Sequence, residues 1–573
     1  MSNQYNSFFI PVKKFRKGYL EMPEEFKNLF VANISDKQPL WFIDKDSSKH
    51  IVEYYPDRNL VSGLAEWHRK YNPAEDSIIS LIVLNMVNKE FRISISGEQA
   101  EHQKNGLFIG REYNMVGAKK YEASSDYYLS LEDITKHIFV CGITGSGKTV
   151  IGKAIIEESV KKGIPSIIID LKGDISSLAL VLTTVEEFKK WVEQGRKGNI
   201  DTIAEKEFQN HYAYLEKFGI TREEACEYKQ KALFRIFTPR SNKGIPIEFG
   251  SPLSAPPDPI NLFKEDPEIF NNLVNSLTGA FIDRLYPGKK RSKIENERNY
   301  LYEIVHYAWL HGVDLQGVNG LRKLLEMIIE PPFQQIGGLE VERYIDAENR
   351  RNRLINKVNT LLSGPETMWF EGKSYTVDSF LECEDAKVPI NIINLVELDY
   401  FEDRSFVVAQ ITYEIQKWMR KQQGTTYPRI IFFIDEIGGG GGKQALFPSF
   451  PYECAAKWGL NYLVRQGRSF GVCCIFATQN PGDIDYKGLS NCHTWIIGKL
   501  ATERDRKKVM EGMEVWGLNA EKVSRNLATA QSGDFVIKDA RSDIKFIKER
   551  WLLSYHRVLT IDEIAKMKQS NFK

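Results

Sequence analysis

The chain has 573 residues, too many for one ordinary hydrophobic core, so the sequence predicts two to four domains. A hydrophobic content of 42% and a charged content of 27% are typical of a soluble globular protein. The 77 lysines and arginines nearly balance the 76 aspartates and glutamates, giving a net charge of +1. This balance excludes a global positive field, so any contact with nucleic acid would need a local basic surface.

The seven cysteines contain no C-x-x-C pair, and several lie in apolar, strand-like runs. The sequence therefore predicts buried thiols in a reducing compartment, rather than zinc ligands or disulfides. It shows no signal peptide and no apolar run of about 18 residues, the length that spans a bilayer. We expect a cytoplasmic protein without a membrane segment.

Residues 1–115 alternate short apolar runs with turn signals, which predicts a small β-rich, barrel-like domain. Four segments in it (22–26, around 41, 64–67 and 76–79) loosely resemble a DNA-binding pseudobarrel. A barrel that only organises an oligomer is the commoner meaning of such a pattern, and we favour it.

Residues 142–149 read Gly-Ile-Thr-Gly-Ser-Gly-Lys-Thr, the phosphate-binding P-loop pattern G-x-x-x-x-G-K-T. The apolar run 137–141 predicts a buried strand before the loop, and residues 150–160 predict a helix after it. Strand, glycine loop and helix are the context that this motif requires, so the sequence predicts a nucleotide site. The expected phosphate-binding residues are Gly142, Thr144, Gly145, Ser146, Gly147, Lys148 and Thr149.

Within that site, Lys148 would reach the β- and γ-phosphates of ATP, and the Thr149 hydroxyl would ligate Mg²⁺. The next apolar strand, 166–170, ends in Asp170, which we expect to act through water or Mg²⁺ because it faces the ligand crevice. For Asp174 two interpretations stand equally, an indirect role in the site and simple turn chemistry. A charged helical stretch at 184–232 and a strand at 233–237 follow.

Between 255 and 385 the pattern changes to helices separated by proline-rich hinges. We predict an all-α insertion with helices at 268–285, 293–311, 318–330 and 346–363. Its basic run 289–293 is a candidate DNA contact, although a solvated loop is the commoner meaning of such a run.

A second apolar strand, 429–434, ends in Asp435 and Glu436. After a P-loop, such a pair predicts the other half of an ATPase site. Asp435 would hold the water shell of Mg²⁺, and Glu436 would polarise the attacking water. Five glycines follow at 438–442, then a helix near 452–468 and a strand at 472–477 that leads to Gln479.

These residues resemble the HerA/FtsK superfamily of RecA-like, DNA-pumping ATPases, in particular its bacterial HerA-like helicase branch. The resemblance covers roughly residues 105–560. It rests on the P-loop, on residues 432–437, on the stretch from Arg465 to Asp505 and on residues 550–555. The first 100 residues lie outside it, and the five glycines stand where relatives often carry an aromatic, proline-rich loop.

The resemblance implies a homo-hexamer that hydrolyses ATP with Mg²⁺ and moves double-stranded DNA through a central channel. By motif, Gln479 is similar to the polar sensor of the family. Arg465 and Arg468 are candidates for an arginine finger that reaches the neighbouring subunit's γ-phosphate, and Arg504 is a weaker one. Family members of this kind act beside an effector, such as a nuclease or a sirtuin-like NAD hydrolase, in DNA end processing or anti-phage defence.

We therefore expect an α/β protein with a RecA-like P-loop core that acts as a DNA translocase or helicase. The alternative is a nucleotide-gated hexameric platform that activates an effector and moves DNA little. A missing N-K-x-D signature disfavours a GTPase, and a missing membrane segment disfavours a conjugative motor. The expected domains are the β-rich domain 1–115, a first core segment 116–254, the helical insertion 255–385, a second core segment 386–550 and an extension 551–573.

Overall fold

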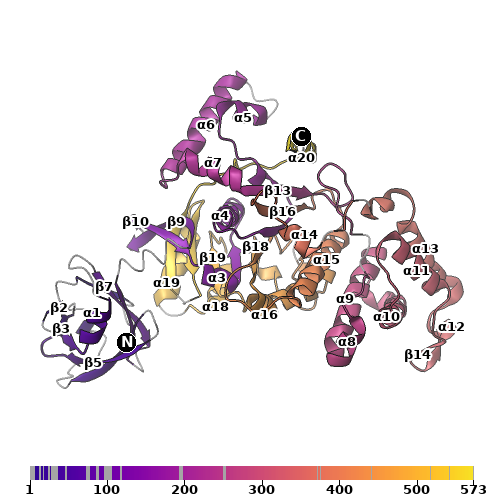
Figure 1. Ribbon diagram of the computed structural model, residues 1–573, viewed down its shortest axis with the longest axis horizontal. Helices are drawn as coiled ribbons and strands as arrows, with labels where there is room; N and C mark the ends of the chain where they lie inside the picture. The colour runs from indigo at the N-terminus through magenta and orange to yellow at the C-terminus, as the bar shows by residue number, and fades with distance from the viewer. Residues whose placement is uncertain are drawn as a thin grey trace. The chain divides into compact units, whose positions relative to one another are not determined.

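The computed structural model of the chain contains two compact units, residues 1–106 and 107–573 (Figure 1). Some positions named in the sequence predictions lie outside the described residues: 23–25 and 76–77 of the pseudobarrel pattern, and 440–441 of the glycine run. The structure describes residues 7–11, 15–16, 19–22, 26–27, 37–44, 48–71, 78–85, 89–95, 106–116, 119–192, 198–249, 253–370, 372–374, 376–439, 442–515, 518–540 and 543–571.

The first unit is an eight-stranded sheet in the order β1-β7-β8-β4-β5-β6-β3-β2. In Figure 1 its strands lie around helix α1 (Ala65–Tyr71), whose Trp67 is buried in the same core as the strand residues. The prediction of a β-rich N-terminal domain is confirmed. The strands are β1 (Ser7–Pro11), β2 (Phe15–Arg16), β3 (Tyr19–Glu21), β4 (Gln38–Ile43), β5 (Lys49–Tyr55), β6 (Leu60–Ser62), β7 (Ile78–Asn85) and β8 (Glu90–Ile95).

The second unit is built on an eleven-stranded sheet in the order β10-β9-β21-β20-β19-β11-β18-β17-β12-β16-β13. The strands from β19 to β13 run parallel, and the others join this block antiparallel. The predicted P-loop α/β core is confirmed. The strands are β9 (Leu107–Val116), β10 (Lys119–Leu129), β11 (Ile138–Cys141), β12 (Ser166–Asp170), β13 (Ala232–Phe237), β16 (Val388–Asn394), β17 (Ile430–Ile434), β18 (Val472–Thr478), β19 (Thr494–Ile497), β20 (Asp534–Lys538) and β21 (Ile544–Glu549).

The central strands are mostly apolar, as expected for strands that are covered on both faces of the sheet. Every residue of β11, β12, β17 and β18 is buried. Successive side chains point to opposite faces, so Phe139 packs into one hydrophobic core while Ile138 and Val140 pack into the other. The helices that accompany the sheet are α3 (Leu131–Thr135), α4 (Lys148–Lys161), α5 (Val185–Trp191), α6 (Ile200–Glu216), α7 (Arg222–Lys231), α15 (Phe401–Met419), α16 (Ala455–Gln466), α17 (Tyr486–Leu489), α18 (Glu503–Gly512), α19 (Leu518–Thr529) and α20 (Ile561–Asn571).

The predicted helical insertion is present between β13 and β16, and its four predicted helices form within a few residues of the expected limits. The last of them begins as a π-helical turn, η5 (Ala347–Arg351), before α13. The helices of this region are α8 (Pro259–Glu265), α9 (Pro267–Leu285), α10 (Glu295–Leu310), α11 (Gly317–Ile329), α12 (Val341–Tyr344), α13 (Asn352–Leu361) and α14 (Val377–Leu381), with a small hairpin of β14 (Gln335–Ile336) and β15 (Leu339–Glu340).

The hairpin of β9 and β10 belongs to the sheet of the second unit, because β9 pairs with β21. The sequence pattern instead assigns residues up to 115 to the N-terminal domain, and it predicts neither β20 nor β21. All four are antiparallel strands, and local alternation does not reveal which of two sheets such a strand will join.

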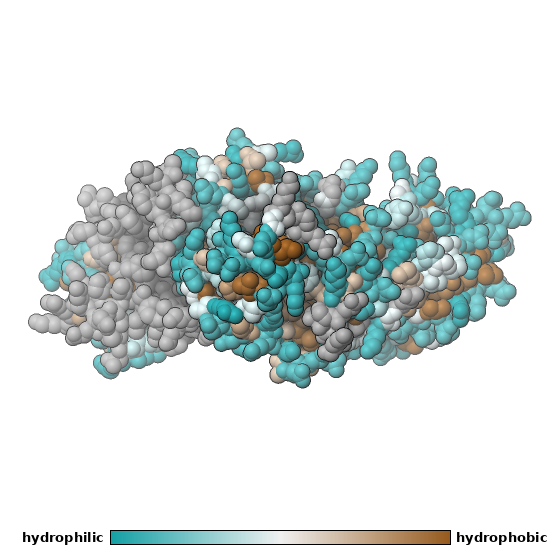
Figure 2. All heavy atoms as spheres, turned by 90° about the horizontal axis from the view of Figure 1, so that it is seen from above, coloured by the Kyte–Doolittle hydropathy of each residue, from teal (hydrophilic) through white to brown (hydrophobic). Residues whose placement is uncertain are grey.

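Hydrophilic residues cover most of the described surface on the face shown in Figure 2, where hydrophobic residues occur in small groups. All seven cysteines are free thiols, and Cys141, Cys454, Cys473, Cys474 and Cys492 are buried. Among the helices that the structure describes, none combines the length and the apolar character needed to cross a membrane.

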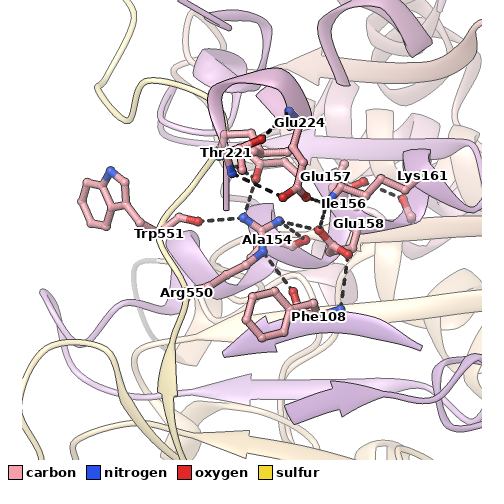
Figure 3. A network of polar contacts seen from close by, with 12 residues as sticks. Phe108, Ala154, Ile156, Glu157, Glu158, Lys161, Thr221, Glu224, Arg550 and Trp551 are labelled. Atoms are coloured by element: carbon pink, nitrogen blue, oxygen red, sulfur yellow. Dashed lines mark hydrogen bonds and ion pairs between the residues drawn. The ribbon is translucent and has the colours of Figure 1, made fainter. Parts of the chain in front are cut away.

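A buried polar network fastens residues 550–554 to the P-loop helix α4 (Figure 3). Arg550 is fully buried and lies between two acids of that helix, 3.0 Å from Glu157 and 3.3 Å from Glu158. Its Nε donates to the carbonyl of Phe108 at 2.9 Å, so β9 is tied in as well. Glu157 also accepts from the amide and the hydroxyl of Ser554, at 2.9 and 2.7 Å. Three segments distant in sequence are thus fixed behind the P-loop.

The replacement Arg550→Met should destabilise the second unit strongly, because it leaves Glu157 and Glu158 buried without their guanidinium partner. Removing one member of a buried ion pair costs about 3–5 kcal/mol. Thermal unfolding followed by calorimetry should show a clear fall in melting temperature. The control is Lys507→Met, which breaks an exposed ion pair with Glu503 and should leave the melting temperature unchanged. Equal melting temperatures for the two variants would contradict a stabilising role for the network.

Candidate active site

The P-loop connects β11 to α4 and takes a conformation that requires glycine. Gly147, the residue before α4, has φ of 102°, in the left-handed region that side chains rarely adopt. A Cβ atom there would also collide with a carboxylate oxygen of Glu549. The loop leads directly into the amino end of the 14-residue helix α4. The free N–H groups and the dipole at this end of the helix favour binding of an anion.

Lys148 is the first residue of that helix and is 6% exposed. Its ammonium group donates to the carbonyl of Ile143, within the P-loop itself, at 3.0 Å. Burial lowers the pKa of Lys148, whereas the carboxylates of Glu436 and Asp435 raise it. The cation is thus held inside the loop by a neutral acceptor, which an anionic phosphate oxygen can replace.

Thr149 and Asp435 form an oxygen pair suited to a hard cation. The Thr149 hydroxyl donates to Asp435, at the carboxyl end of β17, at 2.8 Å. Burial, and then the nearby Asp174 carboxylate, raise the pKa of Asp435 to about 7. No group of three histidines, cysteines or acids able to hold a metal occurs in the described parts of the chain. The hydroxyl and carboxylate oxygens of the pair fit Mg²⁺, which prefers oxygen ligands and completes its shell with water and phosphate oxygens.

A chain of polar contacts crosses the carboxyl ends of four adjacent strands, β11, β18, β17 and β12. Thr144 donates to Gln479 at 2.6 Å, and the Gln479 side chain donates to Glu436 at 2.7 Å. The amide of Gln479 donates to the other oxygen of Glu436 at 3.2 Å. Lys172 is the last residue of this series of contacts and forms an ion pair with Glu436 at 2.7 Å. The P-loop and the strand-end carboxylate are thereby linked within one subunit.

The two acids after β12 differ in what they contact. Asp170 is fully buried and accepts from the amides of Gly173 and Ser176, at 2.7 and 2.9 Å, and from the Ser176 hydroxyl at 2.7 Å. It therefore shapes the turn after β12 instead of presenting free oxygens to a metal. Asp174 has one buried oxygen without a hydrogen-bond partner and acts electrostatically on Asp435.

Two of the three candidate arginines, Arg465 and Arg468, lie at the opposite end of β18 from these polar contacts. Arg465 and Arg468 are exposed at the end of α16 and in the turn before β18, whereas Gln479 directly follows that strand. Seven residues of β18 at about 3.3 Å each put the two ends of the strand about 20 Å apart. Arg504 is exposed in the first turn of α18. The length of β18 therefore separates Arg465 and Arg468 from the P-loop of the same subunit.

Two residues of the site were missed by sequence reasoning. Lys172 had a weak signal, because it stands two residues after an acidic strand end, where side chains face the crevice. Glu549 had none. It is buried beside Gly147, one of its oxygens has no partner, and burial raises its pKa well above the usual range.

Residues 114–415, just over half of the chain, match the protein family described as "Helicase HerA, central domain". The probable helicase MJ1565 of Methanocaldococcus jannaschii is 31% identical over 127 residues, which are 22% of this chain and 24% of that relative. The match thus spans about a quarter of the relative's length.

Two solved structures with low sequence identity are also similar. VirB4 of Thermoanaerobacter pseudethanolicus has a TM-score of 0.45 at 11% identity, over 78% of this chain and 97% of that one. The bacterial conjugative coupling protein TrwBdeltaN70 has a TM-score of 0.43 at 12% identity, over 81% and 94%. With the family match over more than half of its length and a complete P-loop, this chain belongs to the HerA helicase central-domain family of P-loop ATPases.

Proposed function

We propose that this ATPase works as a hexamer that uses Mg²⁺-dependent ATP hydrolysis to move along double-stranded DNA. The observation that carries the proposal is the continuous polar chain from Thr144 through Gln479 to Glu436. It joins a phosphate cradle to a carboxylate that can act on water, so that one set of contacts links nucleotide binding to hydrolysis.

In this proposal the residues of one subunit divide the work. Lys148 and the P-loop amides bind the phosphates, and Thr149 and Asp435 hold Mg²⁺, which neutralises phosphate charge when bound. Glu436 accepts a hydrogen bond from the attacking water and makes it a better nucleophile. Gln479 senses whether the γ-phosphate is present, because it is hydrogen-bonded to both Thr144 and Glu436.

We further propose that an arginine of the neighbouring subunit completes each site. Charge that develops on the γ-phosphate is commonly stabilised by an arginine, worth on the order of 10³–10⁵ in rate. The separation of Arg465 and Arg468 from Lys148 by the length of β18 supports an action across a subunit boundary. The family resemblance supports a ring of six and a separate effector, a nuclease or an NAD hydrolase, in DNA end processing or anti-phage defence.

The replacements Lys148→Ala and Glu436→Gln should fail in different ways. Loss of Lys148 removes the cation that pairs with phosphate, so nucleotide binding should fall. Glu436→Gln keeps the cradle but loses the basic oxygen, so ATP should bind and turnover should fall by on the order of 10²–10⁴. Calorimetric binding and phosphate release measure the two steps. Near-normal turnover in Glu436→Gln would show that another group activates the water.

Duplex DNA should bind through its phosphates, because a translocase must pass over any sequence. Affinity should fall steeply between about 50 and 200 mM salt, and two duplexes of unrelated sequence should bind alike. Duplex should also stimulate ATP hydrolysis. Fluorescence anisotropy and phosphate release measure these effects. Salt-independent binding without stimulation would favour the alternative function, a nucleotide-gated platform that activates its effector.

Mixing inactive subunits tests the shared site. Rings of Lys148→Ala subunits and rings of Arg465→Ala,Arg468→Ala subunits should both be inactive. Mixed rings should recover some of the turnover, because some interfaces then combine an intact P-loop with intact arginines. Subunit exchange is verified with differently tagged chains. Exchange without recovery would mean that the arginines act within their own subunit or serve only the fold.

A further inference from the structure

Lys172 is a second cation in the active site, beside Lys148. The proposed function assigns no role to it. It follows β12 by two residues and lies 2.7 Å from the Glu436 carboxylate. Its side chain is 44% exposed, whereas that of Glu436 is 8% exposed. The lysine is therefore the mobile member of the pair and the glutamate is the fixed one.

The surroundings of Glu436 explain why it stays in place. Its backbone has φ of 62°, in the left-handed region, which costs energy and persists only where neighbouring contacts enforce it. The backbone and side chain of Gln479 hold its two carboxylate oxygens, at 3.2 and 2.7 Å. Lys172 donates to the same oxygen as the Gln479 side chain. With one donor on one oxygen and two on the other, the carboxylate has less room to accept a hydrogen bond from a water molecule.

The backbone that carries Lys172 is also anchored. The buried Asp170 carboxylate accepts from the amides of Lys172, Gly173 and Ser176, so the turn after β12 is rigid. Gly173 has φ of 87°, and a Cβ there would lie 3.0 Å from the carbonyl of Leu559. A change of partner by Lys172 thus requires only rotation of its long, half-exposed side chain.

We propose that Lys172 changes partner with the nucleotide state: it pairs with Glu436 when no γ-phosphate is present and moves to the γ-phosphate when ATP binds. The γ-phosphate carries more negative charge than one carboxylate and therefore competes for the ammonium group. Departure of Lys172 frees the Glu436 oxygen to polarise water. The pairing thus keeps the Glu436 oxygen occupied until a γ-phosphate is in place. This inference rests on the proposed roles of Glu436 and the P-loop.

Affinities for ADP and for a non-hydrolysable ATP analogue, both with Mg²⁺, test this exchange by calorimetry on the full chain. Four proteins form a cycle: the natural chain, Lys172→Met, Glu436→Gln and the double variant. In Glu436→Gln the lysine has lost its competing anion, so the analogue should bind on the order of tenfold more tightly. In Lys172→Met the analogue should bind more weakly. ADP affinity should be equal in all four proteins.

The double variant separates two explanations. If Lys172 moves to the γ-phosphate, Glu436→Gln should no longer tighten analogue binding once Lys172 is replaced. If tightening persists in the Lys172→Met background, it reflects relief of repulsion between Glu436 and the γ-phosphate, and the exchange is refuted. Equal weakening of ADP and analogue in Lys172→Met would show a merely structural role and would also refute it.

Two further variants serve as controls. Lys172→Arg keeps a mobile cation and should recover most of the preference for the analogue over ADP. Lys264→Met, which removes an exposed lysine of α8 in the helical insertion, should behave as the natural chain. If the natural chain binds neither nucleotide, the proposed function itself fails. If it binds and hydrolyses ATP but the cycle shows no dependence on Lys172, only the present inference fails.

Discussion

The active site depends on one constraint, the lateral order of the parallel strands. Neighbouring strands lie about 4.8 Å apart and their carboxyl ends share one edge, so strand order decides which side chains can touch. Here β18 lies between the P-loop strand β11 and the acidic strand β17. Gln479 can therefore reach Thr144 on one side and Glu436 on the other. The strained backbone of Glu436 is stabilised by the same contacts.

A second level of organisation lies behind the P-loop. The parallel block ends at β19, and the antiparallel strands β20, β21 and β9 extend the sheet. This extension brings Arg550 beneath α4, where Glu157 and Glu158 surround it. A buried network of this kind tolerates little misplacement, because each unpaired member is costly. It therefore gives the helix that carries Lys148 and Thr149 a fixed position relative to the strands.

Sequence reasoning succeeded where the signal is local. Hydrophobic periodicity, together with glycine and proline at the ends of the elements, predicts the strand, glycine loop and helix around Lys148. The same signals predict the four helices of the insertion. It failed where contacts depend on strand order. Lys172 and Glu436 are 264 positions apart in sequence, and Arg550 and Glu157 are 393 apart. No periodicity encodes such pairs, and alternation alone does not tell β9, β20 and β21 which sheet to join.

The span between Arg550 and Glu157 also governs when a subunit matures. Chains are synthesised from the amino end, and domains generally fold as units while synthesis proceeds. The acids of α4 emerge almost 400 residues before the guanidinium that neutralises them. Until residue 550 has left the ribosome, Glu157 and Glu158 lack their guanidinium partner, although Glu158 keeps an ion pair with Lys161 of the same helix. The packing around the P-loop helix is therefore completed only after nearly 400 further residues have been synthesised.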